Sequence, residues 1–290
     1  MEQYTPIYST QDKTVNFVLN TEDGGKIETR FVRRKSEYFI VYLSSHTGCV
    51  KACKFCHLTA TQQTYFTHIT KEQYLEQAQT IFNYYDNLPT EQKTAEVAHY
   101  DFMVRGEPLA NKYVLKQGFE ILSGLCEKAA TRNLIPKFNL STIMPVEASR
   151  KRLASLFSGI YPTIYYSLYS LSPEFRKHWM PQAMDPYRAL DILAQYQQDS
   201  KKLIKIHGCI IKDQNDSLED WHKILEEVRK RELKVSFNLV KYNPYSEKHG
   251  EESEIDTVKA INSLIKEYQQ SKIIERVGFD VKASCGMFVD

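Results

Sequence analysis

Three cysteines lie within eight residues of one another, at Cys49, Cys53 and Cys56. Their spacing is C-x3-C-x2-C, and the aromatic residue Phe55 precedes the last of them. Three thiolates can hold three irons of a cubane iron–sulfur cluster. The fourth iron then has no protein ligand and can bind a small molecule. The spacing therefore predicts a [4Fe-4S] cluster with one open iron.

Two other metal sites could use part of this segment. Cys53 to His57 fits C-x-x-C-H, the attachment pattern of c-type haem. That chemistry needs export, the N-terminus has no export signal, and Cys49 would be left unexplained. His57 could also complete a zinc site, but structural zinc usually takes two separated pairs of ligands. Four ligands packed this closely would make a poor tetrahedral cage, so the cluster is favoured and the other two sites stay open.

The composition is that of an ordinary globular protein, with 42% hydrophobic and 26% charged residues over 290 positions. No apolar run approaches the roughly 18–20 residues that a membrane helix needs. The N-terminus also lacks a secretory signal. We therefore expect a cytoplasmic protein without a membrane partner, in which a disulfide framework is not expected.

A net charge of +2 neither requires nor excludes a nucleic-acid partner. Basic clusters at 30–35, 201–205 and 229–234 could meet phosphates, although a solvated face is the commoner reading of each.

The elements that must position the cysteines alternate between strand and helix. About six βα units predict a parallel sheet wrapped by helices, and in such folds chemistry gathers at the carboxyl ends of the strands. The cysteine segment follows the first of these strands directly. Thr70 and Gln73 have the spacing of a capping box at the start of the first long helix. Strands are predicted at 39–43, 97–104, 137–140, 163–168, 203–211, 234–240 and 277–283, and helices at 71–88, 112–130, 146–157, 185–197, 218–231 and 255–269.

Before this series, the sequence predicts a β-hairpin. Strand-like segments at 15–19 and 26–32 flank a turn that ends in Asp-Gly-Gly, and these residues supply the backbone angles of a tight turn. We expect residues 1–36 to form an N-terminal β-hairpin extension and residues 37–290 to form the main α/β domain.

The motifs of the chain resemble those of the radical SAM (S-adenosylmethionine) superfamily, whose signature is C-x3-C-x-aromatic-C. Within it, the chain looks like the RlmN/Cfr family, which methylates adenine in RNA. The order and rough spacing of the family's motifs hold from about residue 14 to the end. The matching segments are Ser44–Cys49; Gly106–Asn111, for G-E-P-L-x-N; Leu140–Thr142, for L-S-T; Ser167–Tyr169, for S-L-H, followed by Arg176 and Pro181; Asn215-Asp216; Asn238-Leu239 with Tyr242–Pro244; and Ser284–Gly286, for A-C-G.

The resemblance implies a partial (β/α)6 TIM-like barrel that binds a [4Fe-4S] cluster at Cys49, Cys53 and Cys56. It also implies roles for other residues. Cys285 would accept a methyl group from SAM and pass it to an adenine carbon, and Glu28 aligns with a glutamate treated as the proton acceptor in the family. The residues that would contact SAM are Gly106, Glu107, Ser141, Ser167, Leu168, Tyr169 and Asn243.

The chain departs from the family in ways that bear on mechanism and substrate. The family carries a second cysteine seven residues before the first cluster cysteine, and its disulfide with the methyl-carrying cysteine frees the RNA. Tyr42 stands there, and a phenol cannot form a disulfide. Cys209 is a candidate substitute, whereas Cys126 is expected in the core. His46 and Tyr169 replace the usual Gln and His. The family's N-terminal RNA-binding domain is expected to be absent.

Three functions follow. The first is an RlmN/Cfr-like methyltransferase acting on tRNA or rRNA, as a monomer reduced by a flavodoxin or ferredoxin. The second is a divergent radical SAM enzyme that modifies DNA, a nucleotide or a protein without the two-cysteine mechanism. The third is a SAM- or RNA-binding protein without turnover.

Overall fold

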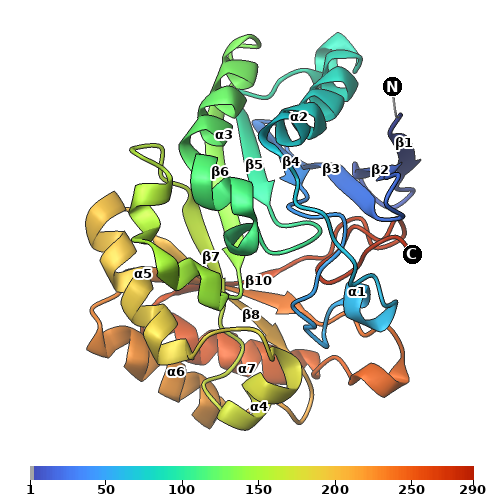
Figure 1. The fold of residues 1–290 in the computed structure, drawn as a ribbon. Helices are drawn as coiled ribbons and strands as arrows, with labels where there is room; N and C mark the ends of the chain where they lie inside the picture. Colours follow the sequence, from blue (N-terminus) through green and yellow to red (C-terminus); the bar gives the residue numbers. More distant parts are fainter. Residues whose placement is uncertain (1–2) are drawn as a thin grey trace.

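One ten-stranded sheet, with its strands in sequence order, organises the computed structural model, which describes residues 3–290 (Figure 1). Neighbouring strands are antiparallel from β1 to β4 and parallel from β4 to β10. The strands are β1 (Thr5–Tyr8), β2 (Val15–Asn20), β3 (Lys26–Lys35), β4 (Tyr38–Leu43), β5 (Val97–Phe102), β6 (Ile135–Thr142), β7 (Thr163–Ser167), β8 (Ile204–Ile210), β9 (Val235–Lys241) and β10 (Gln270–Ile274).

Long helices follow the outer face of this curved sheet (Figure 1). The sheet stays open, since β10 pairs only with β9, but Arg34 Nη1 of β3 donates to Glu275 O beyond β10 at 3.2 Å and so links its two sides. The predicted partial barrel is confirmed. The helices are α1 (His57–Ala60), α2 (Lys71–Asp86), α3 (Lys112–Ala130), α4 (Pro173–Trp179), α5 (Pro186–Ser200), α6 (Leu218–Lys230) and α7 (Ile255–Lys266).

Alternation along β4 separates the core from the interior of the sheet. Phe39 and Val41 are fully buried under the helices, and the Phe39 ring centroid lies 4.4 Å from that of Tyr85 on α2. Tyr42, one position further on, lines a cavity on the opposite face. Because side chains point to alternate faces of a strand, each parallel strand contributes apolar residues to the helices and polar ones to the cavity.

Local signals predicted several elements correctly. The hairpin is β2–β3, with Gly24 at φ +79° in its turn. Thr70 and Gln73 form the predicted capping box, and α3 spans the predicted residues. Because β3 also pairs with β4, the hairpin continues the main sheet, and its division from the rest as a separate unit stays a prediction.

Two elements predicted from sequence were wrong. Residues 146–157 form two 3-10 turns, because Lys151 is extended (φ −140°, ψ 157°) and interrupts the helical run. This segment lies so close to α3 that a Cβ at Gly118 would sit 2.5 Å from Leu156 O. Residues 277–283 are not a strand, since the last strand ends at Ile274 and Gly278 turns the chain with φ +61°.

The short strands β1 and β10 and the short helices α1 and α4 were not predicted. No helix within residues 3–290 is both long and apolar enough to cross a membrane.

Candidate functional site

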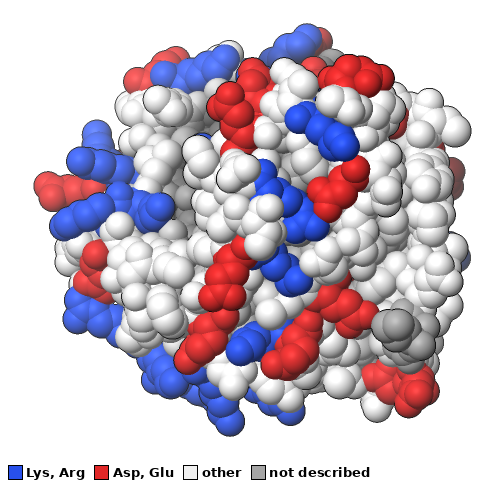
Figure 2. All heavy atoms as spheres, turned by 90° about the horizontal axis from the view of Figure 1, so that it is seen from above, with Lys and Arg blue, Asp and Glu red and all other residues white. Residues whose placement is uncertain are grey.

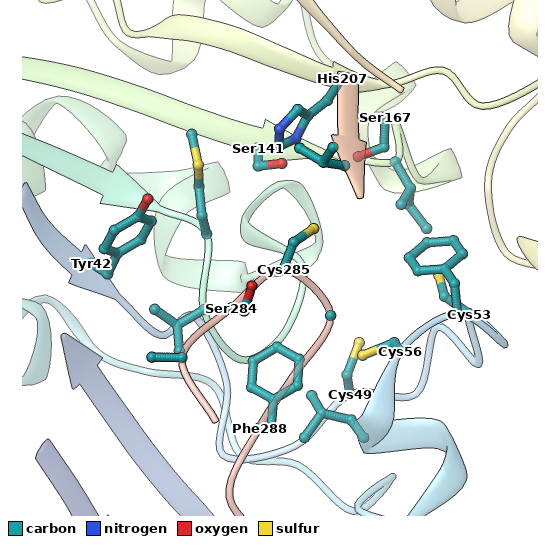
Figure 3. Close-up of a pocket in the computed structure, with 18 of the residues that line it drawn as sticks. Tyr42, Cys49, Cys53, Cys56, Ser141, Ser167, His207, Ser284, Cys285 and Phe288 are labelled. Carbon is teal, nitrogen blue, oxygen red and sulfur yellow. The ribbon is translucent and has the colours of Figure 1, made fainter. Parts of the chain in front are cut away.

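A cavity of about 230 Å³ lies inside the open sheet, and most of the predicted site residues line it. The three clustered cysteines are at one end, Tyr42 is at the other, and Cys285 lies between them (Figure 3). The predicted residues on its wall are Cys49, Cys53, Cys56, Gly106, Glu107, Ser141, Ser167, Tyr169 and Cys285.

The loop that carries the cysteines is held at its start by two buried amide side chains. Gln77 of α2 accepts from Ser44 N at 2.8 Å and donates to Ser44 O at 3.2 Å. Asn111 Nδ2, at the start of α3, donates to Ser45 O at 2.6 Å and to Ile69 O at 3.0 Å. These bonds reach backbone groups just beyond the end of β4, where Ser45 O also accepts from Ile69 N at 3.1 Å, and they fix the direction in which the loop leaves β4.

The three thiols share one environment. Burial raises the pKa of Cys49 to about 11 and that of Cys56 to about 12, and it raises the pKa of Cys53 strongly; the charges of neighbouring cysteines add to the shifts of Cys53 and Cys56. Thiols in such a place ionise when a metal binds them, because the metal's positive charge offsets both effects.

The donor set and its shared cavity therefore fit an iron–sulfur cluster. Within residues 3–290, no three His, Cys, Asp or Glu side chains are grouped tightly enough to hold a single metal ion.

Beside the thiols, Glu107 presents a carboxylate whose direction is fixed. Its Oε1 accepts from Leu109 N and its Oε2 from Ile143 N, both at 3.0 Å. Burial raises its pKa to about 7, and these bonds oppose the shift. Gly106 precedes it at φ +90°, and a Cβ there would lie 2.3 Å from His46 Nδ1. Only glycine therefore allows this close approach of the backbone to the His46 side chain.

Cys285 is held by its backbone and leaves its thiol free. Asn243 Nδ2 donates to Cys285 O at 2.8 Å, and His57 N donates to Gly286 O at 2.9 Å. Gly286 has φ +76° and turns the chain beside Phe55. Cys285 is exposed to the cavity, but the surrounding protein keeps water from solvating the thiolate and so raises the pKa of the thiol to about 11. In Figure 3 it points across the cavity toward Ser141, Ser167 and His207.

The remaining predicted residues lie outside the lining of the cavity. Leu168 is fully buried in the main core. Asn243 binds the backbone of Cys285, and Glu28 is a residue of β3 that is buried within an ion-pair network. Cys209 is buried, with 3% of its surface exposed. The charge of Cys285 contributes to raising the pKa of Cys209, so the two thiols are within electrostatic range. The functional roles given to these residues stay predictions.

Sequence reasoning missed the basic character of the cavity. Five Lys or Arg residues line it against two Glu residues. The strand alternation of β3 could have revealed Arg30 and Arg34, which share one face of the strand, whereas the 30–35 cluster was interpreted as a single solvated group. Nothing local marked the others, because they come from separate strands and loops. The basic residues are Arg30, Arg34, Lys51, Lys241 and Arg276, and the acidic ones are Glu107 and Glu275.

Comparison with known proteins gives a consistent result, although no family model matches the chain. It is 29% identical to the dual-specificity RNA methyltransferase RlmN of Aliarcobacter butzleri (strain RM4018), over 94% of this chain and 72% of that protein. It is 25% identical to RlmN of Nautilia profundicola, over 95% of this chain and 77% of that protein.

Among solved structures, a radical SAM methyltransferase from Sphaerobacter thermophilus matches with a TM-score of 0.78 and 16% identity, covering 99% of this chain and 81% of that one. Fold and sequence thus agree with the motifs that line the cavity. The chain is similar in sequence to the RlmN proteins and has the fold of the radical SAM enzymes.

Proposed function

We propose that this protein is a radical SAM methyltransferase that moves a methyl group through Cys285 to an adenine carbon of RNA. One observation carries the proposal: Cys285 lies between the cysteine end of the cavity and the end marked by Tyr42 (Figure 3). A thiol that must receive a methyl group from one molecule and present it to another has to be reachable from two sides.

At the cysteine end, Cys49, Cys53 and Cys56 would hold the cluster, and Glu107 would take hydrogen bonds from the ammonium of SAM. Cluster and SAM together supply the methyl group and the radical that activates it. The chain's own part is to orient them: Gly106 allows close approach, and Ser141 and Ser167 offer hydroxyl groups on the facing wall.

At the other end, the lining fits a nucleotide. Arg34 and Lys241 can meet phosphates, while Tyr42 offers aromatic surface for a base. A base must leave its stack to enter a cavity of this kind. This combination supports tRNA or rRNA as the substrate, in line with the named activity of the RlmN relatives. We further infer a monomer in the cytoplasm, reduced by an electron donor such as flavodoxin or ferredoxin.

The test is anaerobic incubation of the reconstituted protein with methyl-labelled SAM and separate pools of tRNA and rRNA. We expect label first on the peptide that contains Cys285 and then on adenine, read by mass spectrometry. A Cys126→Ser variant, altered in a half-buried thiol on α3, serves as the control and should label normally. Absence of label on Cys285 in active protein would exclude the shuttle.

Tyr42 favours one second candidate, a radical SAM enzyme that modifies DNA, a nucleotide or a protein without two cysteines. Besides the three cluster cysteines, Cys285 is the only cysteine among the described residues of the cavity wall, so no second thiol faces it there. In this case Cys285→Ala would keep product formation. Loss of product with continued SAM cleavage would instead support the methyl shuttle.

A further inference from the structure

The carboxylate of Glu28 is completely enclosed, and all of its hydrogen-bonding capacity is used. Oε1 accepts from Arg105 Nε at 2.9 Å and from Val289 N at 3.1 Å. Oε2 accepts from Arg30 Nη2 and from Asn16 Nδ2, both at 2.8 Å. A carboxylate has about four lone-pair sites. These donors therefore occupy all of them, and the side chain is 0% exposed.

This environment makes Glu28 a poor proton acceptor. Burial alone would raise its pKa, but the charges of Arg30 and Arg105 and the hydrogen bonds outweigh burial and hold the pKa below its usual value. No substrate atom can reach the carboxylate without displacing one of its donors. The arrangement thus favours a structural task over the proton transfer that the family resemblance implied.

The donors that meet at Glu28 also grip the C-terminal segment on both sides of Cys285. Before the cysteine, Asn16 Nδ2 donates to Val281 O at 3.1 Å. After it, Arg30 Nη2 donates to Met287 O at 2.9 Å, and Arg105 Nη2 donates to Val289 O at 2.6 Å.

The ring of Phe288, within the same segment, faces both arginines. The Arg30 and Arg105 guanidinium carbons lie 5.2 Å and 5.7 Å from its centroid. This places a residue of the cavity wall directly on the ion-pair network.

We propose that Glu28 is a positioning residue that seats Cys285, acting through Arg30, Arg105 and Asn16. Only the catalytic use of the Cys285 thiol rests on the proposed function; the positioning itself does not. Its physical basis is charge: two buried guanidinium groups are held next to each other by one carboxylate between them. Without that charge they would repel each other and draw in water, and the carbonyl groups they bind would be released.

The decisive variant is Glu28→Gln, which keeps shape and removes charge. Hydrogen–deuterium exchange on the full chain without cofactors should show exchange of the 281–289 amides accelerated about 10-fold or more, since the segment opens more often. Alkylation of Cys285 by iodoacetamide should rise in parallel. The matched control is Glu22→Gln, on the exposed β2–β3 turn, which should leave both rates unchanged.

A second variant separates seating from proton transfer and serves if Glu28→Gln does not fold. Arg105→Lys leaves the Glu28 carboxylate in place but loses the planar fork that joins Glu28 to Val289. If Glu28 positions Cys285, the 281–289 amides should exchange faster in this variant too. If Glu28 is a proton acceptor, their exchange rates should not change.

With cluster and SAM present, Glu28→Gln should still cleave SAM but methylate Cys285 more slowly. Exchange and alkylation rates equal to those of Glu22→Gln would overturn the proposal. Because these two readouts need no turnover, they stand or fall independently of the methyltransferase assignment.

Discussion

At the scale of single residues, Asp101 shows how the interior of the sheet differs from an ordinary core. It is 5% exposed, lies in register between Tyr42 and Asn139, and accepts from Asn139 Nδ2 at 2.6 Å. Burial raises its pKa to about 7, and Asn139, Lys205 and Arg34 only partly oppose the shift. Asp101 was not singled out in the sequence, because alternation places a residue on a face of the strand but does not reveal that this face encloses a polar cavity.

This pKa makes stability depend on pH in a specific direction. In the unfolded chain Asp101 ionises near 3.8, but in the folded protein only near pH 7. Between these values the folded state binds more protons than the unfolded chain. The contribution of Asp101 to the unfolding free energy is therefore largest at low pH and is lost as the pH rises to about 7. Asp101→Asn should keep the hydrogen bond to Asn139 and cannot ionise, so its unfolding free energy should not fall as the pH rises. At pH 8 the variant should therefore be more stable than the parent by a few kcal/mol, at about 1.4 kcal/mol for each unit by which the pKa is raised. Urea unfolding at pH 4 and pH 8 checks this, and an equal difference between variant and parent at both pH values would contradict it.

At the scale of elements, caps and turns were predictable and tertiary contacts were not. The capping box of α2 and the bounds of α3 follow from local chemistry that the sequence states directly. The prediction for the 146–157 segment failed because tight packing against Gly118, and not helix propensity, decides its shape. The cysteine spacing predicted Cys49, Cys53 and Cys56 as ligands of a cluster, and this stays a prediction. The amides of Gln77 and Asn111 that hold their loop come from distant helices and gave no local signal.

Asn111 joins a helix to the cysteine loop, and its removal should affect both. Its Oδ1 caps α3 by accepting from Tyr113 N at 2.7 Å, while its Nδ2 holds Ser45 O. Asn111→Ala should cost about 2–4 kcal/mol of unfolding free energy, through the lost cap, the unpaired carbonyl of Ile69 and the weakened bonding of Ser45 O, which keeps only its bond from Ile69 N. It should also lower iron retention. The control is Ser217→Ala, which removes the exposed cap of α6. It should cost only about 1 kcal/mol and retain iron fully. Equal iron content in the two variants would argue against the link.

At the scale of the whole molecule, the small net charge does not reveal how charged side chains are distributed between the surface and the cavity. The chain carries only +2 overall, and the face seen in Figure 2 shows both signs interspersed. Among the charged residues of the cavity wall, in contrast, five are basic and two are acidic. The alternation of strands and helices was enough to predict the partial barrel. The gathering of Arg34, Lys241 and Arg276 around Glu275 depends on how β3 meets the end of β10, which no local pattern encodes.

RNA affinity should depend on these cations. Replacing Arg34 and Lys241 with alanine should weaken tRNA binding and reduce the slope of log affinity against log salt by about 1 for each phosphate that the protein no longer neutralises. Filter binding from low to moderate salt measures both effects. Lys116→Ala, on the exposed side of α3, should leave the slope unchanged. A double variant with an unaltered slope would mean that RNA approaches by another route.

The grip of Glu28 on the amide of Val289 spans 261 positions of the chain. During synthesis, the carboxylate and its arginines emerge long before the backbone groups that they will hold. The loop with Cys49, Cys53 and Cys56 can be complete while Cys285 is still unmade. A polypeptide interrupted before residue 289 would therefore lack the last of the contacts that hold the segment around Cys285, so the ribosome must finish this stretch before the wall of the cavity is complete.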